Sequence, residues 1–197
     1  MHTVRSVDLS PGPRAALVAS ALWLATIALE LARGRPPICT CGHVRLWSAE
    51  ANSAENSQQI ADWYSFSHVI HGLLFYGAAW LLARWIAPRW SRWAFPAAVA
   101  LEGLWELAEN SPAVIERYRA ATVSLGYVGD SVLNSASDVA FMALGFWIAS
   151  RLPWWASVAM GVGFELFTLA MIRDNLTLNV LMLVWPIETI RVWQAAG

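Results

Sequence analysis

The chain has 197 residues, of which 57% are hydrophobic and only 14% are charged. A soluble domain of this length would carry about 25% charged residues, so the composition indicates a membrane protein. The net charge of -1 gives no indication of nucleic-acid binding, and the 13 tryptophans suit anchoring at a membrane interface.

Residues 1–14 are interpreted as a short polar tail, and residues 15–197 as a single transmembrane helical domain. Apolar segments predict spans at 15–32, 63–85, 93–109, 130–150 and 154–172. A last apolar segment, 176–193, is short for a full span but usable as one. The pattern therefore predicts an all-α, polytopic transmembrane helical bundle of five to six spans.

Two connecting segments stand out between these spans. A long polar loop, 33–61, follows the first span, and a short surface helix is expected at 114–121, after Pro112 ends the third span. With the N-terminus placed inside the cell, the loop is an outer loop. This orientation gives the inner loops a charge of +5 and the outer half -6.

Acids, histidines and asparagines lie inside the apolar segments, where each ionisable group costs several kcal/mol. They occur at the starts of the second and fourth spans and the ends of the third and fifth. Because consecutive spans run in opposite directions, these four places meet at one face. The sequence therefore predicts one polar cavity in one leaflet half.

Three glutamates, Glu102, Glu106 and Glu109, follow one face of the third span within an arc of roughly 60°. Three carboxylates cannot all stay ionised together in a low dielectric, so a proton, a cation or a metal should accompany them. In the alternative, Glu109 lies at the water interface and arginines 117, 119 or 173 pair with the other two as structural glue.

His68 and His71 are three residues apart, so both imidazoles can face one side of the second span. Such a pair can ligate one divalent metal or hold a carboxylate. The alternative is two interfacial histidines bonded to backbone or to acids.

Asp130, Asn134 and Asp138 step by four along the start of the fourth span. Asp130 follows a glycine and is expected to cap the helix, because a carboxylate accepts the free N–H groups of a first turn. Capping cannot explain Asp138, two turns further in. Asp138 is therefore the strongest single candidate for a functional residue.

Two further motifs lie at the ends of spans. Arg173, Asp174 and Asn175 form a polar break that could line a cavity and bind a phosphate, or could be an ordinary interfacial hairpin. Cys39 and Cys41 are the only cysteines; they could form a disulfide, bind a metal with His43, or remain unlinked thiols.

Several strings together resemble the UPF0314, or DUF2585, family of bacterial membrane proteins, from about residue 30 to the C-terminus. They are Gly34-Arg-Pro-Pro-Ile-Cys-Thr-Cys-Gly42, Glu55-Asn-Ser-Gln58, Asp62-Trp-Tyr-Ser-Phe-Ser-His-Val-Ile-His-Gly72, Trp105-Glu-Leu-Ala-Glu-Asn110, Arg117-Tyr-Arg-Ala120, Gly129-Asp130 with Asn134, and Ile172-Arg-Asp-Asn-Leu-Thr-Leu-Asn179. The resemblance implies a multi-pass protein of the bacterial cell inner membrane. It implies no activity.

The leading hypothesis is a membrane-embedded hydrolase or transferase that acts on a lipid or lipid-linked envelope substrate at the outer leaflet. Carboxylates would supply the general acid and base, with Glu106 and Asp138 as the leading pair. Further catalytic candidates are Glu102, Asn134 and Asp130. His68 and His71 would ligate a divalent metal or orient a water. The predicted substrate-binding residues are Arg173, Arg117 and Asn175. The alternatives are a proton- or cation-coupled transporter and a non-catalytic membrane assembly protein.

Overall fold

A computed structural model describes residues 9–85, 88–122 and 126–196, and over these residues every regular element is a helix. The helices are α1 (Pro13–Ala32), α2 (Ser65–Trp85), η1 (Pro88–Trp93), α3 (Ala94–Glu109), α4 (Pro112–Ala121), α5 (Val132–Arg151), α6 (Trp154–Ile172), α7 (Leu176–Val184) and α8 (Glu188–Ala195). The all-α prediction is confirmed. Residues 1–8 of the expected polar tail lie outside the described residues.

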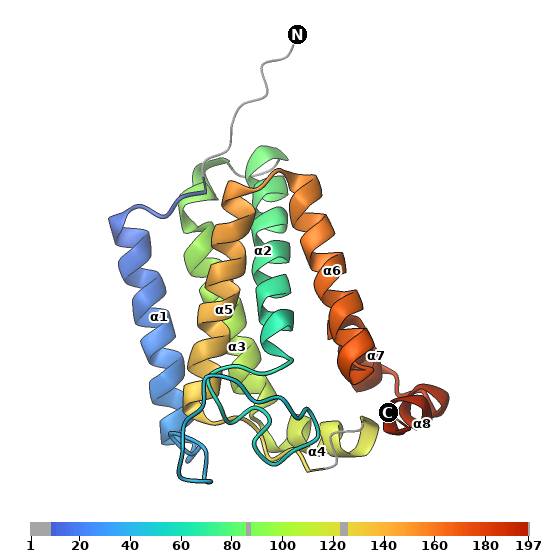
Figure 1. Ribbon diagram of the computed structural model, residues 1–197. Helices are drawn as coiled ribbons and strands as arrows, with labels where there is room; N and C mark the ends of the chain where they lie inside the picture. The colour runs from blue at the N-terminus through green and yellow to red at the C-terminus, as the bar shows by residue number, and fades with distance from the viewer. Residues whose placement is uncertain (1–8, 86–87, 123–125, 197) are drawn as a thin grey trace.

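Four helices in the described ranges are long and apolar enough to cross a membrane: α1, α2, α5 and α6. They lie side by side with α3 as an upright bundle (Figure 1). α3 has 16 residues, or about 24 Å at 1.5 Å per residue, against about 30 Å for a hydrocarbon core. A span count of five or six stays a prediction.

The last apolar segment does not form a single long helix. It is divided into α7, with nine residues, and α8, with eight, by the extended backbone around Pro186. Both helices and the C-terminus lie at the end of the bundle that carries the 33–61 loop (Figure 1). A sixth span would put Glu188 and Arg191 on the inner side, whereas α8 places both at the pole of the bundle that carries the loop. The two are ion-paired to each other, so the charge segregation is unchanged.

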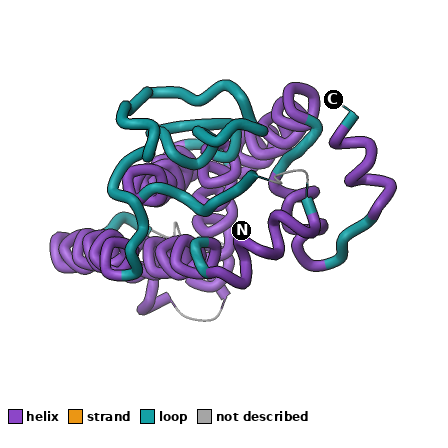
Figure 2. Tube along the Cα trace, turned by 90° about the horizontal axis from the view of Figure 1, so that it is seen from below, coloured by secondary structure: helices purple, strands orange, loops and turns teal. Residues whose placement is uncertain are grey.

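The 33–61 loop crosses the helix ends at one pole of the bundle (Figure 2). Its last residues are buried and bonded to the start of α5. The Gln58 side chain donates to the Gly129 carbonyl at 2.6 Å, and the Asn134 side chain donates to the Gln59 carbonyl at 2.9 Å. These bonds fix the loop over the polar ends of the helices.

The closest helix contact joins α2 and α5, which run in the same direction (Figure 1). A Cβ added to Gly72 would lie 2.0 Å from the Met142 carbonyl oxygen, and one added to Gly145 would lie 2.1 Å from the Val69 carbonyl oxygen. Only glycine allows backbones to approach so closely. The half of the bundle away from the loop is filled by an apolar core of Ala19, Ala98, Val99, Val139, Met142 and Phe146.

Candidate functional site

His68 lies at the centre of a buried polar cluster between α2, α3 and α5. Its Nδ1 is 2.6 Å from Glu102 Oε1 and 3.6 Å from Glu106 Oε1. Its Nε2 is 3.7 Å from Asp138 Oδ2. The imidazole therefore contacts one carboxylate directly and has another beyond each ring nitrogen. We call His68, His71, Glu102, Glu106 and Asp138 the central cluster.

Glu102 connects the two histidines. His71 Nδ1 lies 3.0 Å from both carboxylate oxygens of Glu102, and the glutamate side chain is fully buried. His68 is also buried, and both rings bond to an acid, as the simpler alternative expects. Glu102 fixes the orientation of both rings, the role that a carboxylate beside a metal-ligating histidine usually has.

Glu106 and Asp138 differ from Glu102 because they lack hydrogen-bond partners. Both carboxylate oxygens of Glu106 and Oδ1 of Asp138 are buried and accept no hydrogen bond from the described residues. A buried carboxylate without a partner is expensive, and such groups in a native fold need an explanation. Glu30, at the end of α1, shares this property but lies outside the central cluster.

The arginines do not provide the missing partners. Arg117 donates from Nε to the Leu183 carbonyl at 2.8 Å, and Arg173 donates from Nη1 to the Trp193 carbonyl at 3.0 Å. Arg119 likewise donates to a backbone carbonyl, that of Tyr127. In the described ranges, the ion pairs that involve arginine are those of Arg45 and Arg191. The pairing of these glutamates with arginine as structural glue is therefore not observed.

The helix contacts explain why His68 and Asp138 meet. Gly72 and Met142 touch where α2 and α5 approach most closely, and each candidate residue precedes its contact residue by four positions. The two helices run in the same direction. The residues one turn before Gly72 and Met142, which are His68 and Asp138, therefore also lie opposite each other. Glu102 and Glu106 are one turn apart on α3 and face the same side, as their spacing predicts.

The donor atoms of the central cluster suit a divalent cation. His68, Glu106 and Asp138 each offer one ligand atom within 4.8 Å of the others, and so do His68, His71 and Glu102. Imidazole nitrogens and carboxylate oxygens both ligate divalent zinc and iron, and the second set, with two imidazoles and one carboxylate, has the composition of the non-haem iron triad. The unpartnered oxygens of Glu106 and Asp138 are the observation that makes the first set the better fit.

A small polar cavity of about 30 Å³ lies against the cluster. Its walls include His68 and Asp138, together with Tyr64, Glu109, Tyr118, Tyr127, Asp130 and Asn179. This volume holds one or two waters, which need roughly 10–15 Å³ each, and is too small for a lipid headgroup. Asn56 and Tyr127 also line a larger outer pocket of about 330 Å³, bounded by the loop and by Arg191 of α8.

Asp130 does not cap α5, so that expectation is wrong. Ser131 is the N-cap, and its hydroxyl accepts the Asn134 N–H at 3.2 Å. The Asp130 carboxylate instead accepts from the Tyr127 hydroxyl at 2.8 Å and from the Asn110 side chain at 2.9 Å. Burial raises the pKa of the Asp130 carboxyl.

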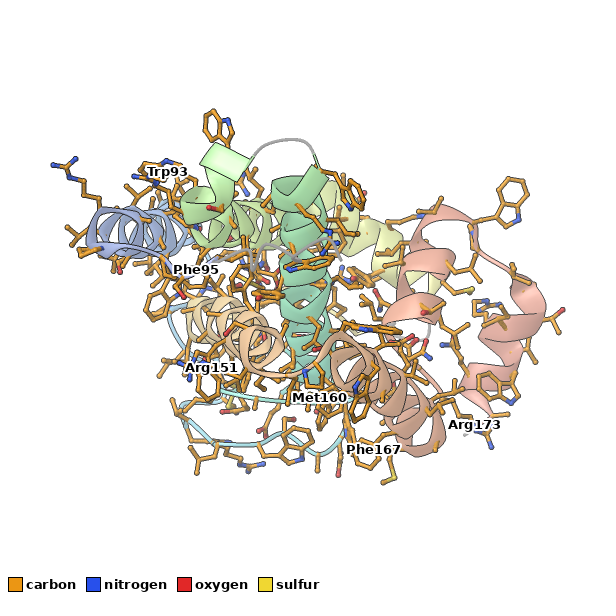
Figure 3. The ribbon with its side chains drawn as sticks, turned by 90° about the horizontal axis from the view of Figure 1, so that it is seen from above. Trp93, Phe95, Arg151, Met160, Phe167 and Arg173 are labelled. Carbon is orange, nitrogen blue, oxygen red and sulfur yellow. A yellow bond between two sulfur atoms is a disulfide. The ribbon has the colours of Figure 1, made fainter. Side chains whose placement is uncertain are left out.

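The side chains of the other predicted site residues bond to backbone groups. Asn134 anchors the loop, and Asn175 caps α7 by accepting the Leu178 N–H at 2.8 Å. Arg173 lies at the outer edge of the molecule beside α8 (Figure 3), with its guanidinium over the Trp193 ring. A phosphate-binding role for Arg117, Arg173 or Asn175 stays a prediction.

Asp174, which lies in the polar break expected after the fifth span, is a further buried acid at the same pole and was not among the predicted site residues. Asp174 accepts from the Asn175 N–H at 2.9 Å, the Gln194 side chain at 3.0 Å and the Tyr64 hydroxyl at 3.1 Å. Burial raises the pKa of its carboxyl to about 6. These bonds attach α8 to the start of α2.

Several residues that line the cavity or bond its acids were also missed: Tyr64, Asn110, Tyr118 and Tyr127. Tyr118 donates its hydroxyl to the Asn179 side chain at 3.0 Å. Three tyrosines near the ends of apolar segments were the available signal, since a buried phenol needs a polar partner.

The chain matches the family model described as "Protein of unknown function (DUF2585)" over residues 30–196. It is 57% identical to a UPF0314 protein of Novosphingobium aromaticivorans, with 98% of each chain covered. It is 59% identical to a UPF0314 protein of Paracoccus denitrificans, over 91% of this chain and 89% of the relative. No solved structure matches this chain.

Proposed function

Because the chain belongs to the DUF2585 family, whose description gives no activity, its function must come from its residues, and we propose a membrane-embedded hydrolase or transferase. Its substrate would be a lipid or a lipid-linked envelope molecule, reached from the leaflet that carries the 33–61 loop. The observation that carries the proposal is the pair of buried carboxylates, Glu106 and Asp138, with unpartnered oxygens beside an oriented histidine.

Glu106 and Asp138 would act as general base and general acid. A carboxylate can take a proton from a water or a hydroxyl only if one of its oxygens is free to accept it, and these two residues have such oxygens. Asp138 and His68 line the small cavity, so a water held there would lie against both. Glu102 is a positioning residue, because its carboxylate holds the imidazoles of His68 and His71.

Alternatively, His68, Glu106 and Asp138 would hold a divalent cation, with the two carboxylates as its ligands and not as acid and base; when bound, the cation would polarise a phosphoryl or acyl oxygen or acidify a water. Glu102 would then orient the imidazole from behind, through Nδ1. The bound cation would also offset the negative charge of the two buried carboxylates. An arginine would then not be needed to neutralise these carboxylates. This agrees with the observed bonds of Arg117 and Arg173 to backbone carbonyls.

The substrate headgroup would lie in the outer pocket and only the reacting bond would approach the cluster. The small cavity is too narrow for a headgroup, whereas the 330 Å³ pocket has a suitable volume. The two share Asn56 and Tyr127 as wall residues. Tyr127 would therefore separate headgroup from catalytic water.

Two observations favour an enzyme over the alternatives. A carrier needs a polar path through both leaflets, but the half of the bundle away from the loop holds an apolar core around Met142 and Phe146. An assembly protein with polar glue would have its buried acids paired with arginine, and Glu106 and Asp138 are not. We therefore place the transporter and the assembly protein second.

A deletion strain of the native bacterium would test the proposal by mass spectrometry of its envelope lipids. When Glu106→Gln or Asp138→Asn is expressed in this strain, we expect the lipid profile to stay that of the deletion. The matched control Glu116→Gln changes an exposed glutamate of α4 and should restore the wild-type profile. If both cluster variants restore it at normal membrane levels, the catalytic proposal is wrong.

The metal part has its own measurement. Purified full-length protein should contain about one divalent cation per chain by elemental analysis, and Asp138→Asn should lose it. Absence of stoichiometric metal from protein isolated without chelators would remove the cation and leave the acid–base proposal standing.

The proposed inner-membrane orientation is tested at Glu50, an exposed residue of the loop. In Glu50→Cys cells, a membrane-impermeant maleimide should label the new cysteine from the periplasm. Labelling only after the cells are broken would reverse the orientation.

A further inference from the structure

The 33–61 loop contains a disulfide that the fold has little reason to form. Cys39 and Cys41 are bonded, and the Gly42 N–H already donates to the Cys39 carbonyl at 3.1 Å, with Gly42 at φ +82°. A disulfide between residues two apart closes only a very short loop, so it lowers the conformational entropy of the unfolded chain very little. In the folded chain the turn already holds these residues together. The loop is anchored separately by Gln58 and Gln59.

The two sulfurs are placed differently. Cys39 is buried, at 3% exposed, whereas Cys41 is exposed. An attacking thiolate can therefore reach Cys41 Sγ and not Cys39 Sγ. This asymmetry defines which sulfur would be attacked and which would leave.

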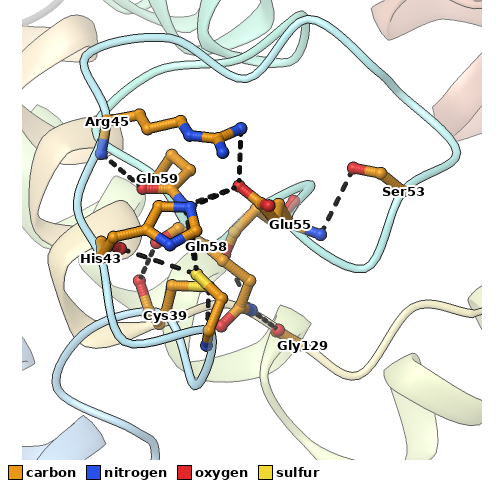
Figure 4. The surroundings of a disulfide bond; sticks show 11 residues. Cys39, His43, Arg45, Ser53, Glu55, Gln58, Gln59 and Gly129 are labelled. Carbon is orange, nitrogen blue, oxygen red and sulfur yellow. Dashed lines mark hydrogen bonds and ion pairs between the residues drawn. A yellow bond between two sulfur atoms is a disulfide. The ribbon is translucent and has the colours of Figure 1, made fainter.

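Each sulfur also has N–H donors that would stabilise a thiolate (Figure 4). The Cys41 backbone N–H donates to Cys39 Sγ at 3.2 Å. The Gln59 side chain donates to Cys41 Sγ at 3.5 Å, and His43 Nε2 lies 3.6 Å from the same sulfur. Such donors, and a nearby imidazole above all, make a sulfur a better leaving group and a more reactive thiol.

His43 is itself held in place by acids and bases of the loop. Its Nε2 lies 3.2 Å from Glu55 Oε2, which also contacts Arg45 Nη1 at 3.2 Å and accepts from the Gln59 side chain at 3.0 Å. The exposed Cys41 sulfur therefore borders a connected polar network of His43, Glu55 and Gln59. A structural bridge would not need this network.

We propose that Cys39 and Cys41 form a thiol–disulfide exchange site that oxidises a protein or peptide dithiol. A substrate thiolate attacks Cys41 Sγ, the Cys39–Cys41 bond breaks, and Cys39 leaves as a thiolate that accepts the Cys41 N–H. The second substrate thiolate then attacks the substrate sulfur of the mixed disulfide and releases Cys41.

The balance is one disulfide for another. Two electrons pass from the dithiol to the pair, the substrate gains a disulfide, and its two protons are taken up by Cys39, Cys41 or solvent. Exchange with a second disulfide-containing protein reverses the step and restores the bond. The site is separate from the central cluster, so it does not depend on the proposed lipid chemistry.

The test uses the purified full-length protein in detergent and a synthetic peptide with two cysteines as the probe. We expect one peptide disulfide to form per protein molecule, with the appearance of two alkylatable thiols and almost no change in thermal unfolding temperature. A bond that the peptide dithiol does not reduce under native conditions, or whose reduction unfolds the protein, would overturn the proposal.

Single variants then test the asymmetry. Cys39→Ser leaves Cys41 and should form a mixed disulfide with an oxidised peptide at least about tenfold faster than Cys41→Ser, which leaves Cys39. His43→Gln should slow peptide oxidation about tenfold, because the imidazole beside Cys41 Sγ is lost. Equal rates for the two cysteine variants would contradict the proposal, even if His43→Gln failed to fold.

Discussion

Two sets of buried acids lie at the same pole of the bundle and differ in how their oxygens are satisfied. The peripheral acids, Asp62, Asp130 and Asp174, have both carboxylate oxygens bonded to backbone N–H groups or neutral side chains. The central acids, Glu106 and Asp138, are equally buried, yet three of their four oxygens accept no hydrogen bond from the part of the chain that the structure describes.

The difference separates structural from functional polarity. Folding can satisfy a buried carboxylate with groups from its own loop, as Asp62 does with the N–H groups of Ser57 and Tyr64. The buried oxygens of Glu106 and Asp138 that accept no hydrogen bond from the described residues destabilise the fold and hold no part of it in place. The peripheral acids hold the pole together, and the central acids are available for chemistry.

The largest expected effect separates the two sets by function. Glu106→Gln or Asp138→Asn should lower activity about 100-fold or more, because a general acid–base group is lost. Neither should lower stability, since a neutral amide replaces an unpartnered buried carboxylate. Activity is followed through the envelope lipid profile and stability through thermal unfolding in detergent. If these variants unfold at a lower temperature but keep a normal lipid profile, the central acids are structural, like the peripheral ones.

The next effect tests what holds the central cluster in position. Gly72→Ala should destabilise the protein by about 3 kcal/mol, because its Cβ would overlap the Met142 carbonyl oxygen. Gly77→Ala is the matched control on the same helix, where an added Cβ meets nothing within 4 Å. Thermal unfolding of both variants gives the comparison. Equal stabilities would show that the glycine contact does not position His68 and Asp138.

A pH effect of intermediate size is expected at a peripheral acid. Burial raises the pKa of Asp174 from 3.8 to about 6, so the folded state binds this proton more tightly than the unfolded state. Protonation therefore favours folding: the contribution is full below about pH 4 and is lost as the pH rises through 6. It amounts to no more than roughly 3 kcal/mol, the free energy of about two pKa units.

The variant Asp174→Asn isolates this contribution. Its unfolding temperature should change less between pH 7.5 and pH 5 than that of the wild type, and activity should be retained. Parallel pH curves for the two proteins would mean that Asp174 does not titrate in this range.

The smallest effect concerns the helix caps of α7. Asn175→Ala should cost about 1 kcal/mol of stability, because the Leu178 N–H loses its acceptor, and should leave activity unchanged. Glu165 accepts the N–H groups of Leu176 and Thr177, so the first turn remains partly capped. Loss of activity with normal stability would instead support the substrate-binding role predicted for Asn175.

The sequence predicted the helices well because their ends carry local signals. The segment expected at 154–172 has those bounds in the structure, and the expected 63–85 begins only two residues later. Proline explains several ends, including the start of α4 at Pro112. The meeting of His68, Glu102 and Asp138 also followed from sequence, since antiparallel spans bring their polar halves to one pole.

Partner choice could not be read from the sequence, because it depends on side-chain positions within a few ångströms. Asp130 is adjacent to the N-cap position, but the shorter Ser131 side chain takes that role and leaves the carboxylate to Tyr127 and Asn110. Arg117 and Arg173 were expected near acids or phosphate, yet both bind carbonyls of the last helices. The sequence shows which groups share a pole and not which of them remain unpaired.

The most direct test of the central claim is the envelope lipid profile of a deletion strain that carries Asp138→Asn at wild-type membrane levels. If the central acids perform chemistry, the profile will match that of the deletion. A profile equal to that of the wild type would show that Asp138 is structural and would contradict the account.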